Sequence, residues 1–210
     1  MMSSPCHTYG AYSSGSYGKE RNRRILEMVK SCGKEKDLST TTRVHVDIEE
    51  IISKDVCIGT ALLSAYAKCG ALEKAQEVFE QLPVWDIVTW NALITGYTQN
   101  GLGDEALKCF KQMKDKNVCP DEVTYVCILK ACGIVGSLEI GMDINAEVRN
   151  NGLLEKYFVL GNALVEMYSK CGELKKAQAV FEGIPIRDVV AWNAVIAGYG
   201  QFGQAYMVLD

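Results

Sequence analysis

The stretch VCIGTALLSAYAKCGALEKAQEVFEQLPVWD, residues Val56–Asp86, recurs as FVLGNALVEMYSKCGELKKAQAVFEGIPIRD at Phe158–Asp188. Roughly half of the aligned residues are identical, and the match continues from IVTWNALITGYTQNG at Ile87 into VVAWNAVIAGYGQFG at Val189. The two copies lie 102 residues apart. Self-similarity of this kind is the sequence signature of a repeat protein, and a period this long indicates that each copy contains several shorter units.

The 102-residue period divides into units of 31, 35 and 36 residues. A further unit precedes them, because Lys30-Ser31-Cys32 matches Lys130-Ala131-Cys132. The end of the fourth unit stays open between Lys156 and Tyr157. The predicted array is 22–55, 56–86, 87–121, 122–157, 158–188 and an incomplete unit at 189–210.

Each unit is predicted to form two short helices. In 56–86, Leu62, Ala65 and Tyr66 recur at helical spacing, Gly70 ends the first helix, and a second apolar stripe follows. One such helix pair cannot bury both stripes, whereas stacked pairs can. The pattern therefore predicts an all-α fold, an α-solenoid of stacked helix-turn-helix repeats whose first helices line a concave surface.

Composition narrows the kind of protein. The nine cysteines show no C-x-x-C spacing and only two histidines are present, so neither a zinc site nor a disulfide framework is expected. No apolar run reaches the roughly 20 residues that span a bilayer. Residues 1–21, rich in Ser, Gly and Tyr, are expected to be disordered. No cofactor, membrane or small-molecule substrate is predicted.

Three strings carry a family resemblance: YAKCGALEKAQEVFEQLP, DIVTWNALITGYTQNGLGDEALKCFKQM and PDEVTYVCILKAC. Together with the alternating unit lengths they resemble pentatricopeptide repeat proteins of the plant PLS type, which cycle short, standard and long repeats. Tetratricopeptide repeats keep a constant period of about 34 residues instead. The resemblance covers residues 22–210 and implies a right-handed solenoid, here expected to be a fragment, because it stops inside its last unit.

The resemblance implies sequence-selective binding of single-stranded RNA in a mitochondrion or chloroplast, in RNA processing or modification such as recognition of editing sites. Relatives that edit RNA use a zinc deaminase with H-x-E and P-C-x-x-C motifs. Neither motif occurs in this chain, which is therefore not expected to be an enzyme. Its partners would be RNA and an RNA-editing deaminase or other proteins of the same family.

The family reads one base per repeat through the fifth residue of the first helix and the last residue of the repeat. Small apolar residues at the second position flank the base. The long units depart from this pattern, because Leu26 and Val126 cannot hydrogen-bond a base. The implied target core is 5′-G-U-N-U-3′. The implied reading residues are Thr60 with Asp86, Asn91 with Asp121, Asn162 with Asp188, and Asn193, whose partner lies beyond residue 210. The implied flanking residues are Cys57, Val88, Val123, Val159 and Val190.

These residues also have structural interpretations. Asn and Asp cap helices well, so the reading residues could simply start helices. Trp90 and Trp192 are expected to pack in the core, and Trp85 is expected to be an exposed aromatic side chain. At the level of the whole chain, the alternative to RNA binding is a protein–protein scaffold of the tetratricopeptide type, because the net charge of −4 suits a basic partner better than a polyanion.

Overall fold

The computed structural model of the protein describes residues 14–202, and every regular element within them is a helix. The all-helical solenoid predicted from the repeats is confirmed. The helices are α1 Ser14–Glu35, α2 Leu38–Ile52, α3 Val56–Lys68, α4 Leu72–Gln81, α5 Ile87–Gln99, α6 Gly103–Asp115, α7 Glu122–Val135, α8 Leu138–Asn150, α9 Leu153–Lys156, α10 Phe158–Lys170, α11 Leu174–Gly183 and α12 Val189–Gln201.

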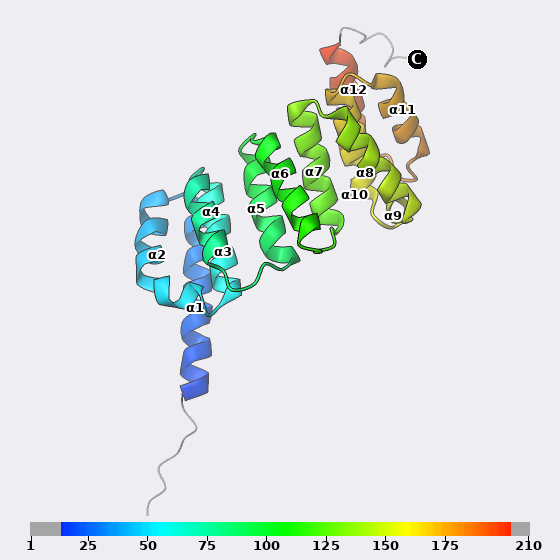
Figure 1. Ribbon diagram of the computed structural model, residues 1–210. Coiled ribbons are helices and arrows are strands. Elements are labelled where there is room, and N and C mark those ends of the chain that lie inside the picture. The colour runs from blue at the N-terminus through cyan, green and yellow to red at the C-terminus, as the bar shows by residue number, and fades with distance from the viewer. Residues whose placement is uncertain (1–13, 203–210) are drawn as a thin grey trace, which may run out of the picture.

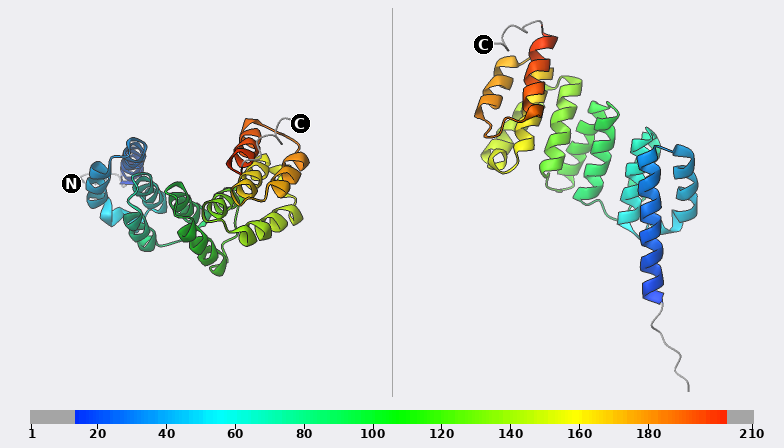
Figure 2. Two further views of the ribbon diagram at one scale, coloured as in Figure 1. Left: turned by 90° about the horizontal axis from the view of Figure 1, so that it is seen from above. Right: turned by 180° about the vertical axis from the view of Figure 1, so that it is seen from behind.

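The helices form a row of antiparallel pairs (Figure 1). First helices α1, α3, α5, α7, α10 and α12 pack against one another in that order. Each second helix packs on its own first helix and on the next one. Seen from above, the row is curved, with α12 toward the inside of the curve and α11 outside it (Figure 2). The first helices therefore provide the inner surface of the solenoid.

Helices α3, α5, α7, α10 and α12 begin at the first residues of the units defined from the sequence. In the four units from residue 56 to residue 188 the turn is closed by a glycine in the left-handed region, as at Gly70 with φ of 76° and Gly172 with φ of 79°, whereas Lys36 with φ of 55° takes this place in the first unit. A side chain at the glycine positions would strain the backbone. The long unit 122–157 contains the extra helix α9, and Tyr157 is the residue that directly precedes α10.

Glycine also permits close approach between first helices. A Cβ atom at Gly96 would lie 2.7 Å from the Cβ of Ala67, a separation too short for two carbon atoms. Gly198 stands in the same relation to Ser169 in the last described unit, again at 2.7 Å. The tight stacking of α3 on α5, and of α10 on α12, therefore depends on these two positions.

Tyrosines on four of the first helices, α3, α5, α10 and α12, fix their units against the preceding ones. Their rings are buried or half-buried, and their hydroxyls reach a polar side chain on the preceding second helix, which satisfies a group that burial would otherwise leave unpaired. The pairs are Tyr66 with His45 at 2.8 Å, Tyr97 with Gln76 at 3.1 Å, Tyr168 with Asn145 at 3.0 Å, and Tyr199 with Gln178.

Three expectations need correction. Trp85 is half-buried rather than exposed, because its indole ring stacks on that of Phe79 with centroids 5.3 Å apart. Residues 14–21 are helical rather than disordered, because α1 extends from the core-anchored Ile25 back through Glu20, which pairs with Arg23 and Arg24 one turn later. Trp192 is 46% exposed, whereas Trp90 is 2% exposed as predicted.

The difference between the two tryptophans comes from their neighbours. Trp90 packs edge-on against both Phe79 and Trp85, with ring centroids at 4.8 and 6.2 Å. Among the described aromatic residues Trp192 contacts Phe181, the equivalent of the first ring, and Arg187 stands where the earlier unit has Trp85.

No helix in the described range is long and apolar enough to cross a membrane. Within the same residues there is no group of three or more His, Cys, Asp or Glu side chains that could hold a metal ion.

Candidate functional site

The inner surface carries a row of exposed apolar side chains at the second position of successive first helices. Val88 and Val190 are 59% and 57% exposed, which is unusual for valine in a folded protein. The row recurs once per unit and has the same position in each helix. Its members, all exposed, are Cys57, Val88, Val123, Val159 and Val190.

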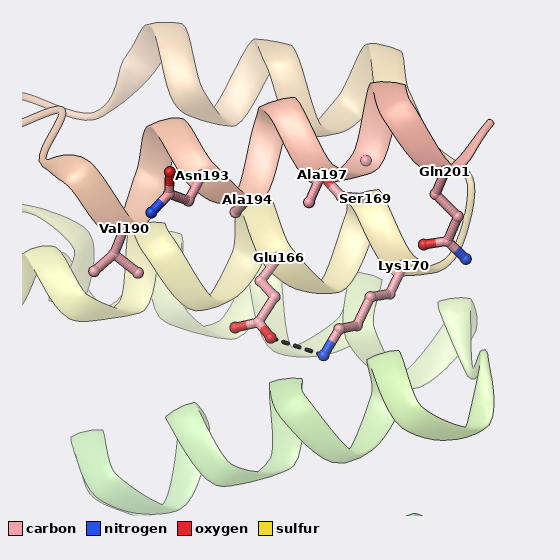
Figure 3. A pocket seen from close by; sticks show the side chains of 9 residues that line it. Glu166, Ser169, Lys170, Val190, Asn193, Ala194, Ala197 and Gln201 are labelled. Atoms are coloured by element: carbon pink, nitrogen blue, oxygen red, sulfur yellow. Dashed lines mark hydrogen bonds and ion pairs between the residues drawn. The ribbon is translucent and has the colours of Figure 1, made fainter. Parts of the chain in front are cut away.

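Shallow grooves run between neighbouring first helices on this surface. One of about 350 Å³ lies between α10 and α12 (Figure 3), with Val190 and Asn193 toward one end and Lys170 toward the other. A second of about 290 Å³ lies between α3 and α5 and is lined by Thr60, Val88 and Asn91, among others. A third of about 420 Å³ lies between α1 and α3. We call these three the inner grooves. Five of the sequence-predicted residues thus line the first two grooves: Thr60, Val88, Asn91, Val190 and Asn193.

Asp86, Asp121 and Asp188 are the N-cap residues of α5, α7 and α12. Their carboxylates accept hydrogen bonds from the backbone N–H three residues on, each at 2.9 Å, from Thr89, Thr124 and Ala191 respectively. The capping interpretation thus holds for the three aspartates. Such caps typically stabilise a helix by about 1 kcal/mol.

The asparagines do not cap helices. Asn91 lies inside α5 and donates from Nδ2 to Asp121 Oδ1 at 2.9 Å. Asn162 lies inside α10 and donates from Nδ2 to both carboxylate oxygens of Asp188, each at 3.0 Å. Each asparagine, on the first helix of its unit, is therefore hydrogen-bonded to the last residue of the same unit. We call Asn91–Asp121 and Asn162–Asp188 the reading pairs.

Thr60 and Asp86, the third predicted pair, are arranged differently. Within the described chain they share no hydrogen bond, and Asp86 instead accepts from the Thr89 hydroxyl at 2.6 Å. Thr60 is nearly buried but lines the inner groove between α3 and α5. The structure thus places Thr60 at the groove without joining it to Asp86.

The hydrogen bonds lower the pKa values of the aspartates. The Thr89 hydroxyl lowers that of Asp86, and the backbone N–H of Ala191 lowers that of Asp188. Burial raises the pKa of Asp121, but bonds from the Thr124 backbone and from Asn91 outweigh burial and leave the pKa below its ordinary value. All three carboxylates are thus held in the charged, accepting form near neutral pH.

One further hydrogen-bonded Asn–Asp pair was not predicted from the sequence. Asn22 donates from Nδ2 to Asp55 Oδ2 at 2.9 Å, and Asp55 caps α3 as the last residue of the first unit. Asn22 lies one helical turn before Leu26, the apolar residue at the reading position. The signal was present in the sequence, since Asp55 precedes Val56 just as Asp86 precedes Ile87.

Lysines on the last turns of the first helices were also missed. Lys34 and Lys68 line the inner groove between α1 and α3, and Lys170 lines the groove between α10 and α12. Lys170 pairs with Glu166 on the same helix at 2.7 Å (Figure 3). The groove between α1 and α3 therefore carries positive charge even though the chain has a net charge of −4, whereas Glu166 balances the charge of Lys170 in the groove between α10 and α12.

A solenoid of helix pairs, with apolar, amide and carboxylate side chains repeated along its inner surface, defines a modular repeat protein that presents equivalent contacts to an extended ligand. Residues 85–133 match the PPR repeat family, and residues 60–87, 162–188 and 190–210 match the PPR repeat. The chain belongs to the pentatricopeptide repeat family.

Two relatives come from Arabidopsis thaliana. The mitochondrial pentatricopeptide repeat-containing protein At3g11460 is 40% identical over 152 residues, which are 72% of this chain and 24% of the relative. The chloroplastic protein At4g18520 is 36% identical over 187 residues, which are 89% of this chain and 30% of the relative. The chain thus spans about a quarter to a third of the length of these two proteins.

A solved structure shares the fold. It is the crystal structure of the pentatricopeptide repeat protein PPR10 in complex with an 18-nt psaJ RNA element, at a TM-score of 0.67 and 23% identity. The match covers 81% of this chain and 27% of that one.

Proposed function

We propose that this chain binds single-stranded RNA sequence-selectively, with one base for each repeat that carries a reading pair. The observation that supports this most strongly is the recurrence of the same bonded constellation: Asn91–Asp121 and Asn162–Asp188, each beside an exposed valine at the second position of a first helix. A peptide-binding scaffold has no need for identical amide–carboxylate pairs in register with its repeats.

The constellation suits an unstacked base. A base has two apolar faces and a polar edge, and single-stranded RNA offers both to a protein. Val159 and Val190 stand at the same position of successive first helices, where they would cover the two faces. Asn162 and Asp188 come between these two valines in the sequence, and their side chains would bond the polar edge of the base. Thr60 with Asp86 would favour guanine, and the two Asn–Asp pairs would favour uracil, with cytosine second.

The lysines of the inner surface answer the objection from net charge. Lys34 and Lys68 line the groove between α1 and α3 at the last turns of these helices, where they would meet a phosphate backbone that runs beside the row of bases. Few phosphate contacts are needed when base contacts supply much of the affinity. An acidic protein can therefore bind RNA on one basic strip.

The proposed setting is an organelle. At3g11460 is named mitochondrial and At4g18520 chloroplastic, which supports one of these two compartments for this chain. The alternation of 31-, 35- and 36-residue units supports the plant PLS class. The role we propose is recognition of a site in RNA processing or modification, including editing, by binding rather than by chemistry. Catalysis would come from a partner such as a deaminase or from other proteins of the family.

The test is a substitution that changes the preferred base. Thr60→Asn converts the first pair into the type found in the next unit, so preference at the first base of 5′-G-U-N-U-3′ should move from guanine to uracil. Binding of short RNAs that differ only at that base would be measured by fluorescence anisotropy. Ser39→Asn, on the outer helix α2, is the matched control and should leave preference unchanged.

Equal binding of all four bases at this position, unaffected by Thr60→Asn, would contradict base reading. The scaffold function, with a basic protein as partner, would then be the better account.

A further inference from the structure

Asn91 and Asn162 occupy equivalent positions and bind equivalent aspartates, yet their amide oxygens have different surroundings. We propose that Thr124 is a specificity-determining residue: its hydroxyl occupies the acceptor of Asn91 and weakens base reading by the 87–121 unit, whereas Ala191 leaves the buried acceptor of Asn162 unpaired until a base donor bonds it. This inference rests on the proposed function and extends it to a residue outside the reading pairs.

The orientation of the Asn91 amide is fixed by its partner. A carboxylate only accepts hydrogen bonds, so the amide must turn its NH₂ group to Asp121, and the contact is 2.9 Å from Nδ2 to Oδ1. The amide oxygen then faces the other way, toward Thr124. The Thr124 hydroxyl donates to Asn91 Oδ1 at 2.6 Å. Both ends of the Asn91 amide are thus engaged within the protein.

Asn162 makes only half of this arrangement. Its NH₂ group bonds both oxygens of Asp188, which fixes the amide in the same way. Its Oδ1 is buried and has no hydrogen-bond partner among the described residues, although the side chain as a whole is 6% exposed. The third residue of α12, Ala191, corresponds to Thr124 as the third residue of α7, and alanine has no hydroxyl to offer.

The difference matters because of the polar edge of a pyrimidine. Uracil presents the N3–H donor beside the O4 acceptor, and cytosine presents the N4 amino group beside the N3 acceptor. An asparagine recognises either edge fully only when its own oxygen is free to accept. At Asn162 a base donor would satisfy an acceptor whose unpaired burial is costly. At Asn91 the base must first displace the Thr124 hydroxyl, and the net gain is smaller.

Thr124 has a second role, which the test must separate from the first. Its hydroxyl also lies 2.9 Å from Asp121 Oδ1 and accepts from the Asp121 backbone N–H at 3.2 Å, forming a capping box at the start of α7. Thr89 provides the matched control. It is equally buried, and its hydroxyl bonds the cap residue Asp86 at 2.6 Å. The unit before it, however, carries Thr60 rather than an asparagine at the fifth position of its first helix.

The experiment compares two bases in one RNA. Discrimination is measured as the ratio of Kd for adenine to Kd for uracil at the second base of 5′-G-U-N-U-3′, opposite Asn91, and at the fourth, opposite Asn162. In the unsubstituted protein the ratio should be larger at the fourth base by about fivefold, the factor carried by one ordinary net hydrogen bond.

Thr124→Val should raise the ratio at the second base, and Ala191→Thr should lower it at the fourth, each by about the same factor. Thr89→Val should change neither ratio. The reciprocal variant keeps the inference testable if Thr124→Val fails to fold.

Uracil preference of equal size at both bases, unmoved by either substitution, would overturn this inference and leave the proposed function standing. Absence of any preference at both bases in the unsubstituted protein would overturn the proposed function, and this inference with it.

Discussion

Trp85 and Arg187 donate the same hydrogen bond from equivalent positions of the two 31-residue units. Trp85 Nε1 donates to the carbonyl oxygen of Phe79 at 2.9 Å, and Arg187 Nε donates to that of Phe181 at 3.0 Å. Each also covers a phenylalanine ring. The indole stacks on Phe79 at 5.3 Å between centroids, and the guanidinium carbon lies 5.4 Å from the Phe181 centroid. Two chemically different side chains thus close the end of a second helix in the same way.

This equivalence predicts how Trp85 tolerates substitution. Trp85→Arg should change the free energy of unfolding by less than about 1 kcal/mol, because arginine can restore both contacts. Trp85→Ala should destabilise by about 2–4 kcal/mol, since it removes a half-buried aromatic that also covers Trp90. Urea denaturation followed by circular dichroism would measure both. Similar losses for the two variants would show that the shared hydrogen bond is not what matters.

Close helix packing predicts opposite effects for two glycine substitutions. Gly96→Ala should destabilise by about 1–3 kcal/mol, because the new Cβ would meet Ala67 and force α3 and α5 apart. Gly200→Ala adds a methyl group near the end of α12 with no atom of residues 14–202 within 4 Å, and alanine favours helix by up to about 1 kcal/mol. Thermal unfolding of the two variants checks the prediction, which fails if Gly96→Ala matches or exceeds the unsubstituted protein.

The lysines of the inner grooves should act on all RNAs alike. Lys68→Ala should weaken binding of matched and mismatched sequences by the same factor and lower the slope of log K against log salt by about 0.7, as loss of one phosphate contact does for single strands. Lys111→Ala, on the outer helix α6, is the control. Titrations at several salt concentrations give the slope. An effect confined to one RNA sequence would assign Lys68 to base reading instead.

Acid should unfold the protein partly through its helix caps. The pKa of Asp121 is lowered in the fold, so the unfolded chain takes up a proton at higher pH than the folded one. The stabilisation is complete above the ordinary aspartate pKa of about 3.9 and is lost as pH falls through the lower folded value.

Asp121→Asn should therefore be less stable than the unsubstituted protein at pH 7. It should also lose less stability between about pH 5 and about pH 3, two values that bracket the ordinary aspartate pKa. Asp104→Asn, an exposed position on α6, is the control. The melting temperatures of both variants and of the unsubstituted protein, measured across this pH range, test the prediction. Parallel curves for Asp121→Asn and the unsubstituted protein would show that the cap does not contribute to acid sensitivity.

The repeat pattern was sufficient to predict the helix pairs. Apolar spacing around Leu62 and Tyr66, a glycine at position 70 and the recurrence of both 102 residues later define where helices begin and end, because those rules act over a few residues. Asn91 and Asn162 were also predicted to be equivalent, because each is the fifth residue of its unit. The start of α1 was misjudged, since Ser and Gly have low helix propensity and only the packed turns after Glu20 hold the segment 14–21 in a helix.

The sequence by itself determined the number and order of helix pairs, the inner row of valines, and Thr60, Asn91 and Asn193 as groove residues, but not the lysines that line the same grooves. Tertiary structure alone decided which of these residues are joined: Asn91 to Asp121 and Thr124, Asn162 to Asp188 only, and Trp85 to the carbonyl that Arg187 bonds in its own unit. The physical reason is range. Helix periodicity is set by neighbours along the chain, whereas a hydrogen bond between side chains some 30 residues apart exists only once two helix pairs have stacked and fixed their distance.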